Sequence, residues 1–516
     1  MKKLLSIIAS FALLTACTPS SPYQTTTGKH VKSICKQAPF QMEIKVPSFP
    51  GMVYNVVDYG ADPTGQILSH DAFQHAIDLC SETGGGTVLI PAGVYVSGPI
   101  ELKSNVRLYT EYNALILFSD DFSLYPVIDA SFEGLDTKRC QSPISARNAE
   151  NIAITGHGTF NGHGDSWRPL KSTKVTTSQW KQKIKKGVVN EETKVWYPDS
   201  AAMLATALCQ DQNVPVLPAN ASPEDWEAIH SFLRPVMLNF INCKNVLLEG
   251  VCFENSPAWN LHPFVCENVI LRDLEVRNPW YSQNGDGVDV ESCKNVLIED
   301  CRFDVGDDAI CMKSGKNEDG RRRGIPTENV YVKNCVVYHG HGGFVVGSEM
   351  SGGIKNINVE DCLFIGTDVG LRFKSTRGRG GVVENIFINR INMSDIANEA
   401  LLFDLFYGGK GSGEETEEEI AARMGAAIPA VDETTPAFRD INIQNIICKG
   451  SKQTIYFNGL PEMKIQNVSL ANIQMTGKKG AQFNQTNGLT MKNVIIEPEE
   501  GESIMLSGSV DNVSIE

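Results

Sequence analysis

A recurring Asn-Val or Asn-Ile pair is the feature that most constrains how this chain can fold. The pairs begin at residues 245, 268, 295, 329, 356 and 385. Each is followed by a short run rich in β-branched and other apolar residues, which is typical of a β-strand. One such unit cannot bury its own apolar face, so successive units must stack on one another.

The repeat predicts an all-β fold, a right-handed parallel β-helix (solenoid), with Asn at the turns and Val, Ile, Leu, Cys and Phe inside. A β-sandwich also has many strands, but it would not explain why the Asn-Val phase recurs. Residues 71–80 place Ala72, Phe73, Ala76, Ile77 and Cys80 on one helical face. We expect this helix to be the N-terminal cap that closes one end of the solenoid.

Cysteines share the register of the core residues. Cys301, Cys335 and Cys362 each lie six residues after an Asn anchor, where other units carry Leu274 or Ile391. Of 14 cysteines, 13 remain once Cys17 is set aside. We therefore expect them to be mainly reduced and buried as small hydrophobic residues rather than paired in disulfides.

We assign residues 51–516 to a single β-helix domain with two inserted loop regions. The first insertion, at about 165–231, is polar and carries four tryptophans; the second, at about 408–436, contains the acidic run 414–419.

The N-terminus resembles a bacterial lipoprotein signal. Residues 1–17 combine a basic start, an apolar run too short to span a bilayer and the sequence Leu-Thr-Ala-Cys, in which Cys17 would be lipidated. Residues 18–50 are expected to be a tether. The sequence thus predicts an exported lipoprotein, periplasmic or anchored to the outer membrane, with membrane contact only through the lipid.

The chain carries a formal net charge of −15. Such a protein is a poor partner for nucleic acid, because phosphate contacts need a positive surface. An acidic substrate would likewise need a local positive patch. The candidates are Arg321, Arg322, Arg323, Arg372, Lys374, Arg377 and Arg379.

Three carboxylates fall within a short span, at Asp286, Asp307 and Asp308. Cleavage of a glycosidic bond needs two carboxyl groups in different protonation states. Asp307 follows its Asn anchor at the same spacing as His341 follows the next anchor, so we expect the two to stack on successive coils. Carboxylates this close repel one another when all are ionised, so one should keep its proton. Asp289, beside the cluster, is expected to be a turn residue or a cap.

In order along the chain, Asn284-Gly285-Asp286, Gly306-Asp307-Asp308, Gly340-His341-Gly342 and Arg372-Phe373-Lys374 resemble the motifs of the polygalacturonases, glycoside hydrolase family 28. The family's usual first motif is Asn-Thr-Asp, so Gly285 is a departure.

The resemblance implies that Asp307 is the general acid and that Asp286 and Asp308 hold and activate water. His341 would tune the acid. Arg372, Lys374 and Asn284 would bind substrate. No cofactor and no metal are implied. A calcium site around Asp286 and Asp289 is an alternative, but it would leave His341 and the two cations unexplained.

The expected activity is hydrolysis of α-1,4-linked galacturonic acid in pectic polysaccharide or oligogalacturonides, with inversion. The insertions could close one end of a groove, which favours cutting from a chain end. The alternatives are a rhamnogalacturonan-directed hydrolase, a pectate-lyase-like enzyme and a non-catalytic carbohydrate-binding β-helix.

Overall fold

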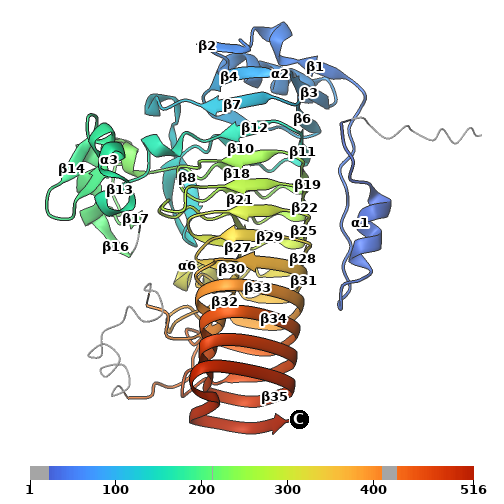
Figure 1. Ribbon diagram of the computed structural model, residues 1–516. Coiled ribbons are helices and arrows are strands. Elements are labelled where there is room, and N and C mark those ends of the chain that lie inside the picture. The colour runs from blue at the N-terminus through green and yellow to red at the C-terminus, as the bar shows by residue number, and fades with distance from the viewer. Residues whose placement is uncertain (1–22, 212, 409–426) are drawn as a thin grey trace, which may run out of the picture.

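The computed structural model describes residues 23–211, 213–408 and 427–516, and it is a right-handed parallel β-helix (Figure 1). The predicted fold class is confirmed. Each coil contributes one strand to each of three parallel sheets, and the coils stack along one axis. The first sheet contains β1 (Val53–Asn55), β3 (Gly86–Ile90), β6 (Val106–Thr110), β11 (Glu150–Gly156), β19 (Lys244–Glu249), β22 (Glu267–Arg272), β25 (Lys294–Glu299) and β28 (Thr327–Lys333).

The second and third sheets follow the same stacking. The second contains β2 (Thr64–Leu68), β4 (Gly93–Ser97), β7 (Ala114–Phe118), β12 (Thr159–Asn161), β20 (Cys252–Glu254), β23 (Glu275–Arg277), β26 (Arg302–Asp304) and β29 (Val336–His339). The third contains β5 (Ile100–Glu101), β10 (Ile144–Arg147), β18 (Leu238–Ile241), β21 (Leu261–Phe264), β24 (Val288–Glu291), β27 (Asp308–Lys313), β30 (Gly342–Val346) and β32 (Leu371–Lys374). The last coils are formed by the long strands β31 (Ile354–Ile365), β33 (Val382–Asp404), β34 (Ala437–Asn458) and β35 (Ile465–Ile515).

The Asn anchors explain the repeat. All six adopt the left-handed backbone conformation, with φ between 56° and 60°, which Asn tolerates better than most residues. From Asn268 to Asn385, each side-chain amide donates to the side-chain oxygen of the preceding anchor at 3.0–3.5 Å. The ladder therefore pins the same corner of each of these successive coils to its neighbour.

The cysteine prediction is confirmed for the 13 cysteines that the structure describes, since all are free thiols and most are buried. Cys301, Cys335 and Cys362 lie in one buried column. A second column, which the spacing from the Asn anchors did not predict, consists of Cys243, Cys266 and Cys293.

The cap is helix α2 (His70–Glu82), which buries the apolar face predicted for it. The predicted tether over 18–50 is wrong from residue 23 onwards. Helix α1 (Gly28–Cys35) and the segment after it form a strap along the first sheet, on the right in Figure 1. Val31, Ile34 and Cys35 pack in a cluster with outward-facing residues of that sheet, namely Ala153, Leu247, Ile270, Leu297 and Tyr331.

The strap forms for a simple physical reason. Without it, this row of apolar side chains would face water on the outside of the solenoid. Polar contacts hold its start in place, because Thr25 and Thr26 donate to the buried Glu249 carboxylate at 2.6 Å. Cys17 and the rest of the signal lie outside the described residues. None of the described helices is long and apolar enough to cross a membrane.

The first insertion projects from the side of the column opposite the strap (Figure 1). It has a small antiparallel sheet of its own, in the order β13-β15-β14, and a separate pair β16–β17. Most of the second insertion lies outside the described residues. The elements of the first are β13 (Leu170–Lys171), α3 (Thr177–Lys183), β14 (Val188–Asn190), β15 (Val195–Tyr197), α4 (Ser200–Ala205), β16 (Cys209–Asp211), β17 (Val214–Pro215) and α5 (Pro223–Glu227).

A further excursion is the hairpin of β8 (Val127–Phe132) and β9 (Leu135–Cys140), which leaves the solenoid between β7 and β10. Its tip reaches the loop that follows β27, where Lys316 N–H donates to the Gly134 carbonyl at 2.9 Å. Asp136 N–H donates to Asp319 in α6 (Asn317–Arg323) at 3.1 Å. Because the hairpin ends just before β10 and its tip contacts the loop after β27, it passes across the third sheet from β10 to β27.

Candidate active site

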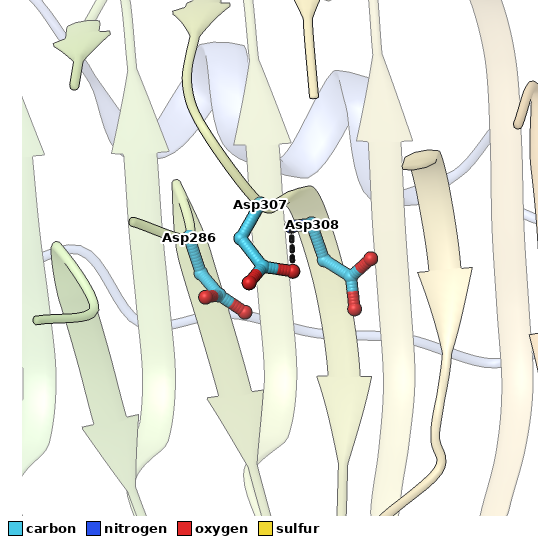
Figure 2. A group of neighbouring side chains, drawn as sticks. All are labelled: Asp286, Asp307 and Asp308. Atoms are coloured by element: carbon cyan, nitrogen blue, oxygen red, sulfur yellow. Dashed lines mark hydrogen bonds between the residues drawn. The ribbon is translucent and has the colours of Figure 1, made fainter. Parts of the chain in front are cut away.

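The three predicted aspartates meet at the start of two neighbouring strands of the third sheet. Asp286 comes just before β24, and Asp307 and Asp308 lie at the start of β27 (Figure 2). Val288 pairs with Ile310, which places Asp286 beside Asp308, and Gly287 N–H donates to the Asp308 carbonyl at 2.9 Å. One carboxylate oxygen from each residue lies within 4.8 Å of the other two. Three charges this close cannot all be carried without a large electrostatic cost.

Asp307 and His341 occupy equivalent places on successive coils, as the spacing from the Asn anchors predicts. Asp308 pairs with Gly342 in the sheet, and His341 N–H donates to the Asp307 carbonyl at 2.8 Å. The His341 Nδ1 atom lies 3.1 Å from Asp307 Oδ1. The Asp307 carboxylate raises the pKa of His341 to about 9. Burial acts to raise the pKa of Asp307, but His341, Lys374 and Arg372 together bring it below its ordinary value.

Asp308 is held by both predicted cations. Lys374 Nζ donates to Asp308 Oδ2 at 2.7 Å, and Arg372 Nη1 donates to Oδ1 at 3.3 Å. All three side chains are more than nine-tenths buried. The ring of Tyr407 lies against both cations, with its centroid 5.5 Å from the Arg372 guanidinium carbon and 5.0 Å from Lys374 Nζ. Sequence reasoning missed Tyr407, because no motif marks it.

Asp286, like Asp308, is almost fully buried, but its Oδ1 has no hydrogen-bond partner among the described residues. Burial, with the nearby Asp289 and Asp307 carboxylates, raises the pKa of Asp286 well above its ordinary value. This shift favours the protonated form of Asp286, beside the ion-paired Asp308.

The expectation that Asp289 is a turn residue or a cap is wrong. Asp289 lies within β24 and is fully buried, and burial raises its pKa to about 8. Lys313 Nζ is 3.5 Å from Asp289 Oδ1 and donates to Glu349 at 2.8 Å. The stretch of residues 313–323 resembles exo-acting polygalacturonases in sequence, but sequence reasoning did not pair Lys313 with Asp289. It missed Glu349, whose only signal is its position just after the end of a site strand.

Asn284 connects the site to the first insertion. Its side-chain oxygen accepts hydrogen bonds from Asn213 Nδ2 and Arg234 Nη2, each at 3.0 Å. Asn213 in turn donates to Glu133 at the tip of the β8–β9 hairpin at 2.9 Å. Insertion, hairpin and catalytic turn thus meet at Asn284, and its predicted contact with substrate stays a prediction.

The predicted cationic patch is smaller than the sequence suggested. Arg372 and Lys374 border the aspartates. The other candidates make ion pairs or hydrogen bonds elsewhere, with Asp136, Glu462, Asn317 and main-chain carbonyls.

The aspartates have the composition of a metal site, but their partners do not favour one. Asp308 already binds two cations and Asp307 binds a protonated histidine, so a divalent cation would meet positive charge on two sides. The absence of a metal cofactor stays a prediction.

Comparisons with known proteins agree with this geometry. The model of "Glycosyl hydrolases family 28" matches residues 230–422, and that of "Rhamnogalacturonase A/epimerase, pectate lyase-like" matches residues 53–190. The exo-poly-α-D-galacturonosidase of Dickeya chrysanthemi is 26% identical over 90% of this chain and 74% of its own length. The endo-polygalacturonase of Pectobacterium carotovorum subsp. carotovorum is 26% identical over 78% of this chain and 83% of its own.

A solved structure covers nearly the whole chain. The hyperthermoactive exopolygalacturonase of Thermotoga maritima is 30% identical, covers 91% of this chain and 96% of its own, and superimposes with a TM-score of 0.70. The stacked aspartates, the histidine and the paired cations occur on a β-helix that this enzyme shares. The chain is a glycoside hydrolase and belongs to glycosyl hydrolases family 28.

Proposed function

We propose that this protein hydrolyses α-1,4-linked galacturonan and releases single galacturonic acid units from a chain end. The observation that carries the proposal is the pairing of three clustered carboxylates with two buried cations, Arg372 and Lys374, at one site. Carboxylates perform glycoside cleavage. The two cations can pair with the carboxylate of a galacturonic acid unit, whereas a neutral sugar would have no group for them to bind.

Asp307 is the proposed acid because it is the most exposed of the three, with 23% of its side chain accessible. In the free site, His341 holds the proton that Asp307 must deliver, since His341 has the higher pKa of the two. A substrate carboxylate that binds Arg372 and Lys374 neutralises two of the charges that depress the pKa of Asp307. The proton can then pass from His341 Nδ1 to Asp307 across 3.1 Å, and from Asp307 to the leaving glycosidic oxygen.

Asp286 and Asp308 act on the water. The protonated Asp286 carboxyl positions the water, and the ionised Asp308 carboxylate takes its proton as its oxygen bonds to the anomeric carbon. The bond from that carbon to the glycosidic oxygen breaks, and the oxygen leaves with the proton from Asp307. Attack opposite the leaving group inverts the anomeric centre. The carboxylates are closer than the roughly 6.5–9.5 Å usual for inverting enzymes, so the inference of inversion depends on the family rather than on spacing.

Release from a chain end is supported by the β8–β9 hairpin. The hairpin lies across the third sheet on the β21 side of the aspartates, and Phe132 packs on Trp259 with ring centroids 4.8 Å apart. A polysaccharide lying along the coils would meet the hairpin and the insertion, which are joined through Glu133 and Asn213. One side of the site is therefore obstructed, as a pocket for a chain end requires.

We further propose, from the signal-like sequence at the N-terminus, that the protein is exported and lipid-anchored through Cys17. Short oligogalacturonides would reach an anchored enzyme more readily than intact pectin.

A panel of pectic substrates tests the proposed activity. We expect new reducing ends from homogalacturonan without the ultraviolet absorbance of an unsaturated product. Absorbance that rises with cleavage would indicate a pectate-lyase-like elimination instead. Cleavage confined to rhamnogalacturonan would support the alternative hydrolase, and binding without turnover would support a non-catalytic module.

A further inference from the structure

The first insertion carries an unusual concentration of positive charge. Residues 171–186 contain six lysines and no acidic residue, in a chain whose net charge is −15. Lys183 lies over the Trp196 ring, but the other five are exposed and make no ion pair with any carboxylate that the structure describes. They are Lys171, Lys174, Lys181, Lys185 and Lys186. Because the net charge of the protein opposes the approach of a polyanion, a local cluster of exposed lysines favours its approach here.

An exposed tryptophan lies beside this charge. Trp280 has 58% of its surface accessible, whereas Trp167, Trp196 and Trp259 are buried. Lys174 Nζ lies 5.0 Å from the centroid of the Trp280 ring. An exposed indole provides a broad, rigid apolar surface against which the C–H face of a sugar ring can pack.

Trp280 is also close to the catalytic turn in the chain and in space. It lies six residues before Asp286, in the loop that leads into β24. The flanking Pro279 and Ser282 pack against Gly306, the residue before Asp307, so closely that a side chain at 306 would collide with them. The loop that carries Trp280 therefore lies against the turn that carries Asp307, and Lys174 of the insertion lies at the Trp280 ring.

We propose that Trp280 and the exposed lysines of residues 171–186 form an accessory binding surface for the part of an oligogalacturonide that has not entered the active site. A pyranose ring packs on Trp280, and Lys174 with its neighbours pairs with galacturonate carboxylates along the chain. This inference rests on the proposed function. It adds that chain length, not only the terminal unit, determines how tightly substrate binds.

The test compares substrates of two lengths. For Trp280→Ala, the ratio of kcat/KM on a long oligogalacturonide to kcat/KM on digalacturonate should fall about tenfold, mainly through a higher KM for the long substrate. The loss of one ring stacked on an aromatic side chain weakens binding by a factor on the order of ten. Tyr112→Ala is the matched control. Tyr112 is 67% exposed, lies in the turn between β6 and β7 and stacks on His157, and its loss should leave the ratio unchanged.

A second variant tests the charge. In Lys171→Gln/Lys174→Gln/Lys181→Gln, kcat/KM on the long substrate should fall and should depend less on salt than in the wild type. If the wild type is active, either of two results would overturn the proposal. One is an equal loss of kcat/KM on both substrates in the lysine variant, and the other is an unchanged ratio in Trp280→Ala. Loss of binding to anionic lipid vesicles in the lysine variant, with no loss on oligogalacturonide, would overturn it in favour of a membrane contact. A wild type inactive on every galacturonan would refute the proposed function itself.

Discussion

Replacement of Lys374 by Met should destabilise the fold as well as stop the reaction. Lys374 and Asp308 form an ion pair at 2.7 Å, with only 7% and 2% of their side chains accessible. Removal of one partner leaves a buried carboxylate charge, which typically costs about 3–5 kcal/mol. Arg372 still contacts Asp308 at 3.3 Å, so we expect a loss near the lower end, about 3 kcal/mol.

A double-mutant cycle isolates the pair from the packing of the lysine stem. Asp308→Asn in the Lys374→Met background removes the orphaned charge, so the double variant should be more stable than the sum of the single effects by about 2 kcal/mol. Urea denaturation of the wild type and the three variants, followed by tryptophan fluorescence at neutral pH, measures each free energy of unfolding. Additive effects within about 0.5 kcal/mol, or a loss below about 1 kcal/mol in Lys374→Met, would refute the reasoning.

Further predictions concern the reaction and the thiols. Asp307→Asn should lower kcat by a factor of about 10²–10⁴ with an unchanged circular dichroism spectrum, and near-normal turnover would remove Asp307 as the acid. Asp286→Asn and Asp308→Asn should also lower kcat severely. Because the raised pKa of His341, about 9, keeps its proton through neutral pH, kcat/KM should fall as pH rises through about 9. His341→Ala should abolish that alkaline limb, and an unchanged pH profile would show that His341 does not hold the proton. All 13 cysteines after Cys17 should react with a thiol reagent under denaturing conditions without reductant; a lower count would reveal disulfides. NMR at early times should show the inverted anomer, and retention would contradict the water-attack mechanism.

The β-helix and the centre of its site were predictable because both follow from local spacing. The Asn anchors fix one corner of the coils that carry the site, so counting the same distance along the chain from Asn295 and from Asn329 places Asp307 next to His341. The same counting placed Cys301, Cys335 and Cys362 in one core column.

The features that sequence reasoning missed depend on contacts between segments with no common spacing. The strap looked like a linker, because its partners, such as Leu247, lie several coils further along the chain. Glu133 meets Asn213 across a separation of 80 residues, and Lys174 meets Trp280 across a still longer one. Asp289 was misassigned because an Asp close to Gly is most often a turn residue, and its burial beside Lys313 depends on a contact between neighbouring coils.

The most direct test of the account is the product profile during the first minutes of galacturonan hydrolysis. The hairpin that obstructs one side of the aspartates predicts that monomeric galacturonic acid appears from the outset, while viscosity and mean chain length change little. A mixture of oligomers with a rapid loss of viscosity would contradict it, because such products require a groove open at both ends.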